Sequence, residues 1–235
     1  MPSLVGSEMC IRDSIKGLVF NLFHSLWPSL YNMDGFLNSM LTPVIKAKKG
    51  KSIEQFYSVK DYEKWKEETE NSNSYHIKYY KGLGTSTPDE ARTYFKDFKN
   101  VKYLTNGEDN EKCLNLAFSK RDNSANDRKK WLSEYDRNNT LDYSHKNVSI
   151  EEFINYDLIH FSNSDNIRSV PSAIDGLKPS QRKVLFCAFK RKLDKEIRVA
   201  QLAGYVSEHG AYHHGETSLQ GTIVNMAQDY VGSNN

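Results

Sequence analysis

Residues 165–198 read DNIRSVPSAIDGLKPSQRKVLFCAFKRKLDKEIR, and they concentrate positive charge. Nine Lys or Arg stand there against four Asp or Glu, a local net charge of +5 in a chain of 235 residues whose total is +2. Proline is tolerated in a first helical turn, so Lys178-Pro179 predicts the start of a helix. Its apolar residues Val184, Leu185, Ala188 and Phe189 should form the buried face, with Arg182 and Lys183 pointing outward. This surface favours a polyanionic partner, and a solvated face without a ligand is the alternative.

A second predicted helix begins near Gly215. Its apolar stripe recurs at steps of three and four residues, through Leu219, Ile223, Ala227 and Tyr230. His213 and His214 would lie at its N-terminus, where the helix dipole favours anions and imidazoles donate to a phosphate or transfer a proton. The alternative is that one histidine caps the helix and the other packs in the core.

The N-terminal half predicts an alternation of helices and strands. We expect helices at residues 15–30, 35–40 and 61–70, and a hairpin of strands at 43–47 and 53–59. A short strand at Tyr79-Tyr80 runs into the glycine turn of residues 81–86, and Thr87 with Glu90 predicts a capping box that opens a helix. The glycines would let the backbone approach a phosphate, while a tight turn without a ligand is the alternative. The pattern indicates an α/β layer.

Four segments are predicted. Residues 1–14 read as foreign to the rest and as an artefact, 15–104 form the α/β part, 105–148 a helical connector and linker, and 149–235 a second domain opened by a capping box at Ser149 and Glu152. Composition excludes two classes. No apolar run reaches the roughly 20 residues of a membrane span, and the three cysteines are too few and scattered for a disulfide framework.

Several motifs together resemble one family. Residues 165–171, 175–185, 212–219 and 231–235 closely resemble the DNA breakage-reunion region of type II DNA topoisomerases. Residues 78–86, KYYKGLGTS, look like the end of the TOPRIM domain of that family. The resemblance covers residues 15–235. Because both parts lie on one chain, it indicates the eukaryotic or viral single-chain type (type IIA), with the eukaryotic nuclear enzyme as the expectation.

The resemblance implies a fold class of α/β plus α+β, with a partial, Rossmann-like TOPRIM domain followed by a mainly helical winged-helix domain. It implies binding of double-stranded DNA, a homodimer, and transient double-strand breakage, strand passage and religation that need ATP and Mg2+. By the resemblance, the DNA-contacting positions are Lys81, Gly82, Gly84, Thr85, Arg168, Lys178, Arg182 and Lys183. His213 and His214 match a pair that supports the chemistry close to the scissile phosphate.

The sequence departs from the family at both ends. Residues 1–14 stand where the family has its acidic metal motif, so no metal role is carried to Asp13, and the nucleophilic tyrosine of the family lies beyond residue 235. With the ligands for Mg2+ and ATP missing as well, we expect these residues to bind DNA without cutting it. The alternatives are a noncatalytic DNA-binding module on the same scaffold, and a nuclease that uses His213 and His214.

Overall fold

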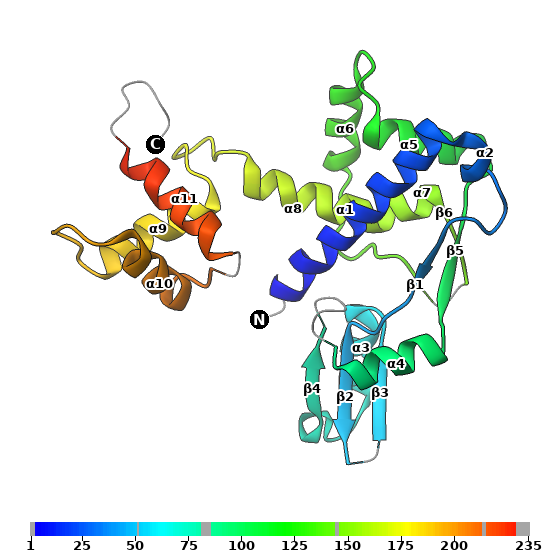
Figure 1. Ribbon diagram of the computed structural model, residues 1–235, viewed down its shortest axis with the longest axis horizontal. Coiled ribbons are helices and arrows are strands. Elements are labelled where there is room, and N and C mark those ends of the chain that lie inside the picture. Colours follow the sequence, from blue (N-terminus) through cyan, green and yellow to red (C-terminus); the bar gives the residue numbers. More distant parts are fainter. Residues whose placement is uncertain (1–2, 51, 81–85, 144–145, 213–214, 229–235) are drawn as a thin grey trace. The chain divides into compact units, whose positions relative to one another are not determined.

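The computed structural model describes residues 3–50, 52–80, 86–143, 146–212 and 215–228 (Figure 1). The chain forms two compact units, Met1–Ser164 and Asp165–Asn235. The predicted boundary between residues 148 and 149 falls inside the first unit. The reason is that β6 (Asn147–Ser149) pairs in parallel with β5 (Asn100–Leu104), which ties this segment to the first unit.

Most of the first unit is a layer of helices beside a small sheet. Its sheet has the order β1-β5-β6, with β1 (Asn38–Met40) antiparallel to β5. The helices are α1 (Ser3–Leu26), α2 (Pro28–Tyr31), α5 (Glu108–Phe118), α6 (Ser124–Ser133), α7 (Ile150–Phe153), a π-helical turn (Ile154–Leu158) and α8 (Ile159–Ser169). α1 continues from Ser3 without a break at residue 14, and it ends ahead of Pro28, as its predicted stop requires.

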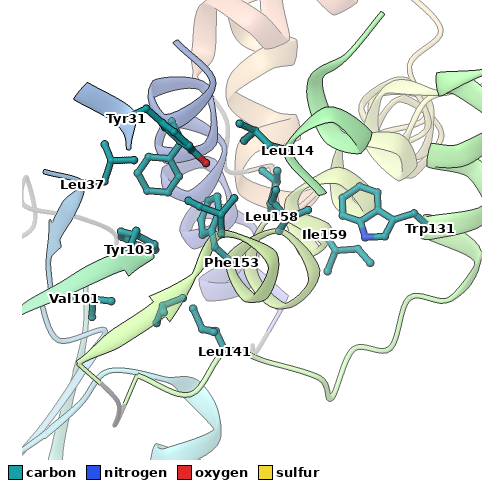
Figure 2. Packing of buried hydrophobic residues seen from close by; sticks show 14 residues of the cluster. Tyr31, Leu37, Val101, Tyr103, Leu114, Trp131, Leu141, Phe153, Leu158 and Ile159 are labelled. Carbon is teal, nitrogen blue, oxygen red and sulfur yellow. The ribbon is translucent and has the colours of Figure 1, made fainter. Parts of the chain in front are cut away.

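Phe153 lies at the centre of the core of this unit (Figure 2). Its ring is fully buried and meets the rings of Phe20 and Tyr103 at centroid distances of 5.1 Å and 5.8 Å. Leu158 and Ile159, further along the same helical run, belong to the same cluster. The core therefore joins α1, β5 and the α7–α8 run.

The second sheet of this unit has the order β3-β2-β4, and it confirms the predicted hairpin. It consists of β2 (Ile45–Lys49), β3 (Ser52–Phe56) and β4 (His76–Tyr79), beside α3 (Val59–Glu68) and α4 (Pro88–Lys96) (Figure 1). Ile45, Ala47 and Phe56 form one small core with Tyr62 of α3. The predicted capping box of Thr87 and Glu90 is present at the start of α4, as is that of Ser149 and Glu152 at the start of α7.

The second unit, where the structure describes it, consists of helices and the loops between them. α9 (Pro179–Lys190), α10 (Val199–His209) and α11 (Glu216–Ala227) pack around a core that includes Val184, Cys187 and Val206. Leu219 and Ile223 of α11 belong to it, as its apolar stripe predicts. Within the described residues, none of the helices is both long and apolar enough to span a bilayer.

Two local predictions are wrong. Residues 35–40 do not form a helix: Gly35 has a φ of +72°, which breaks a helix, and Asn38–Met40 pair with β5 as a strand. On α9, Phe189 is 78% exposed and does not belong to the buried face, which Val184 and Cys187 form at a spacing of three. Tyr230, the last residue of the predicted stripe of α11, lies outside the described residues.

A buried ionic cluster lies against the π-helical turn. Lys16 Nζ is 2.8 Å from Asp13 Oδ1 and 3.7 Å from Asp157 Oδ2, and the Tyr143 hydroxyl donates a hydrogen bond to Asp157. Burial and the charge of Asp13 raise the pKa of Asp157 to about 6, although Lys16 and Tyr143 oppose this rise. The folded chain therefore holds a proton at Asp157 in a pH range where the unfolded chain has released it.

This cluster makes stability depend on pH. Because the folded pKa of Asp157 is raised from 3.8 to about 6, its contribution to the free energy of unfolding is present at acid pH and is lost as pH rises through 6. Urea unfolding of the wild type and of Asp157→Asn should show the wild type losing stability relative to the variant between about pH 4 and pH 6. A constant difference across that range would contradict the assignment.

Candidate nucleic-acid interface

A cavity in the second unit gathers three of the four cations predicted to bind DNA in this part of the chain. Its volume is about 290 Å3. It is lined by residues from the end of α8, the first turns of α9, the segment before α11 and α11 itself: Arg168, Ser169, Lys178, Pro179, Ser180, Lys183, Tyr212, Ser218 and Thr222. None of these described lining residues is Asp or Glu, so a concave surface presents positive charge and hydroxyl groups together.

The loop between α8 and α9 brings Arg168 and Lys178 to one place. Ser172 N–H donates to the Leu177 carbonyl at 3.0 Å, and Gly176 N–H donates back to the Ser172 carbonyl at 2.8 Å. Gly176 has a φ of +68°, a conformation that favours glycine, which explains the Asp-Gly dipeptide in the sequence. The loop therefore returns the chain from the C-terminus of α8 to the N-terminus of α9.

Lys183 ties α9 to the segment that precedes the histidine pair. Its ammonium donates to the Ala211 carbonyl at 2.6 Å. The next residue, Tyr212, is buried, lines the cavity and lies with its hydroxyl 3.4 Å from Ser218 Oγ. His213 and His214 themselves lie outside the described residues. Their described neighbour on the N-terminal side thus belongs to the wall of the cavity.

Arg182 differs from the other cations of α9. Its guanidinium holds the Asp175 carboxylate, with Nε at 3.0 Å from Oδ2 and Nη2 at 2.8 Å from Oδ1. The Leu177 N–H and then Arg182 lower the pKa of Asp175 below its ordinary value. Arg182 is not among the residues that line the cavity. It points outward as predicted, but an intramolecular carboxylate occupies its donors.

The hydroxyl groups of the cavity were not predicted. Ser218 and Thr222 are four residues apart on α11, next to the buried Leu219 and Ile223, so they share one face at the edge of the stripe. That i, i+4 spacing was the available signal. Backbone phosphates accept hydrogen bonds from Ser and Thr as well as from Lys and Arg, so this lining suits a phosphate.

The other predicted sites give a mixed result. Lys81, Gly82, Gly84 and Thr85 lie outside the described residues, whereas Tyr80 before them and Thr87 after them are described. Over the described part of the chain, no group of three or more His, Cys, Asp or Glu is placed to hold a metal ion. Asp13 and Asp157 do approach one another, but the ammonium of Lys16 pairs with both of them. This carboxylate pair therefore does not fit Mg2+.

Two families match successive parts of the chain. Residues 40–166 match the C-terminal associated domain of TOPRIM. Residues 168–235 match the DNA gyrase/topoisomerase IV family. The two matches meet close to the junction between the two compact units at residues 164 and 165.

Individual proteins extend the similarity over almost the whole chain. DNA topoisomerase 2 of Plasmodium falciparum is 49% identical over 98% of this chain and 17% of its own length. DNA topoisomerase 2 top-2 of Caenorhabditis elegans is 48% identical over 94% of this chain and 15% of its own. The crystal structure of the Plasmodium falciparum topoisomerase II DNA-binding, cleavage and re-ligation domain matches with a TM-score of 0.77 at 47% identity, covering 95% of this chain and 30% of that one. The chain therefore spans less than a fifth of the length of these curated relatives.

Proposed function

The chain belongs to the type II DNA topoisomerases, and we propose that its 235 residues contribute duplex-DNA-binding surface to such an enzyme. The observation that carries the proposal is the cavity that gathers Arg168, Lys178 and Lys183 with serine and threonine hydroxyls from α9 and α11. Cations in a concave surface attract a polyanion, and contacts of this kind go to phosphates and need no base recognition.

We propose the remaining roles on the basis of the family. Lys81, Gly82, Gly84, Thr85 and Arg182 contact DNA, and His213 and His214 support the chemistry near the scissile phosphate. The proposed winged-helix domain comprises residues 149–235, and the end of TOPRIM residues 15–104. The whole protein would be a nuclear homodimer that breaks and reseals duplex DNA with ATP and Mg2+. One relative, from Dictyostelium discoideum, is named mitochondrial.

A salt titration tests the proposal. If three cations each neutralise a phosphate, the logarithm of the affinity for a short duplex should fall with the logarithm of the salt concentration with a slope of about −2.7 or steeper. Fluorescence anisotropy measures this with the full chain, and two duplexes of unrelated sequence should bind within about threefold of each other. Binding that does not depend on salt, or that strongly prefers one sequence, would contradict the proposal.

The same preparation separates DNA binding from cleavage. Supercoiled plasmid incubated with the chain and Mg2+ should remain intact, because the proposal gives these residues a binding role. Nicked or linear plasmid that disappears in a His213→Ala, His214→Ala variant would instead favour a nuclease built on the histidine pair.

A further inference from the structure

One carboxylate holds the residues on both sides of the glycine segment, residues 81–85. The Tyr80 hydroxyl, at the end of β4, donates a hydrogen bond to Glu90. The Thr87 N–H, at the start of α4, donates to the other oxygen of Glu90 at 2.8 Å. Thr87 Oγ1 accepts in return from the Glu90 N–H at 3.3 Å, which completes the capping box. Glu90 thus joins two chain positions that are separated by the glycine segment.

The sheet is built so that its cations meet the same carboxylate. Side chains alternate between the two faces of a strand, so Lys78 and Tyr80 share one face, and Lys46 lies directly opposite Lys78 on β2. Lys46 Nζ is 3.3 Å from Glu90 Oε1, and Lys78 Nζ is 2.9 Å from Oε2. Lys46 also lies over the rings of Tyr80 and Tyr94, at 5.2 Å and 4.8 Å from their centroids. The opposite face of β2 packs on α3, so this face is free to hold α4.

The charges of this cluster favour an ionised Glu90. Burial by itself would raise the pKa of Glu90, but hydrogen bonds from Tyr80, the Thr87 N–H and Lys78, with the charge of Lys46, lower it below its ordinary value. Burial and the bond to this carboxylate raise the pKa of Tyr80, so its hydroxyl remains a donor. The contact between β4 and α4 is therefore a charge-assisted one, and such contacts are stronger than those between neutral groups.

We propose that Glu90 is a positioning residue for DNA binding, because it fixes the two ends of the glycine segment at a set separation through Tyr80 and Thr87. The inference rests on the proposed function, in which Lys81, Gly82, Gly84 and Thr85 contact DNA. Glu90 itself makes no contact with DNA in this scheme. It acts by reducing the number of conformations that the segment loses when DNA binds.

The charge of Glu90 makes the proposal easy to separate from simple electrostatics. Removal of an acidic side chain near a DNA-binding surface removes repulsion, so charge alone predicts tighter binding. Positioning predicts the reverse. Asp89 is the matched control: it is the neighbouring acid in the same first turn, its side chain is 90% exposed, and it pairs with Arg92, outside the cluster.

Binding of a short duplex by the full chain, followed by fluorescence anisotropy, tests this. Glu90→Ala should weaken binding about tenfold, the size of effect found within one hydrogen-bonded network, whereas Asp89→Asn should leave binding unchanged or slightly tighter. Tyr80→Phe changes no charge and removes only the hydroxyl that ties β4 to Glu90, so it should weaken binding about threefold. This variant also keeps the test decisive if Glu90→Ala does not fold.

A double-mutant cycle with Lys81→Ala identifies which inference fails. If Glu90 acts through the glycine segment, Glu90→Ala should have much less effect in the Lys81→Ala background, whereas a general structural defect would add to it. If Lys81→Ala alone leaves the affinity unchanged, the proposed DNA contact of the segment is wrong. If Lys81→Ala weakens binding while Glu90→Ala and Tyr80→Phe do not, the positioning role of Glu90 alone is overturned.

Discussion

Replacement of Arg168, Lys178 and Lys183 together by alanine is expected to weaken duplex DNA binding by at least about 100-fold. All three side chains line one cavity, so a phosphate bound there would lose each of its cationic partners. The slope of the logarithm of affinity against the logarithm of salt concentration should become less steep by about 2.7, since each cation displaces close to one counterion. Anisotropy titrations at several salt concentrations measure both quantities.

The control removes the same charge elsewhere. Lys64, Arg92 and Lys112 are exposed on three helices of the first unit, and each pairs with an acid on its own helix. Their triple alanine variant lowers the net charge equally and should weaken binding only slightly. Equal weakening by both triple variants would mean that binding depends on overall charge and that the cavity is not the site. Arg182→Ala should have a smaller effect than Lys178→Ala, because Asp175 already occupies its guanidinium.

The sequence predicts those parts of the fold that local interactions determine. The capping boxes at Thr87 and Ser149 start their helices at the predicted residues, because the donor and acceptor lie three residues apart. β1 escaped prediction for the opposite reason. Its three residues become a strand only through pairing with β5, where Ser39 lies opposite Val101, and nothing in the local sequence specifies that partner.

The candidate site shows the same division. Its positive charge is visible in the sequence, and the structure brings Arg168, Lys178 and Lys183 to one cavity. Their grouping depends on the loop that turns at Gly176, and the same turn places Asp175 against Arg182. Charge counts treat all four cations alike, so sequence alone could not single out Arg182. Which cation is free for a phosphate is a matter of tertiary geometry.

Phe153→Ala is expected to lower the free energy of unfolding of the first unit by about 3 to 5 kcal/mol. Phe153 is fully buried and lies among Phe20, Tyr103 and Leu158, so alanine would leave a cavity among side chains that α1, β5 and the π-helical turn contribute (Figure 2). Domains of this size have a total stability of about 5 to 15 kcal/mol, so much of the margin would be lost. Urea unfolding followed by tryptophan fluorescence measures the change.

The fluorescence signal reports the first unit alone, because the three tryptophans, Trp27, Trp65 and Trp131, all lie before residue 165. Phe95→Ala is the matched control: the same substitution in the same unit, at a ring that is 65% exposed on α4. It should change stability by less than about 0.5 kcal/mol, as substitutions at exposed positions do. If Phe153→Ala were as mild as Phe95→Ala, Phe153 would not be central to this core. The packing of α1 against β5 and the π-helical turn would then have to depend on other contacts.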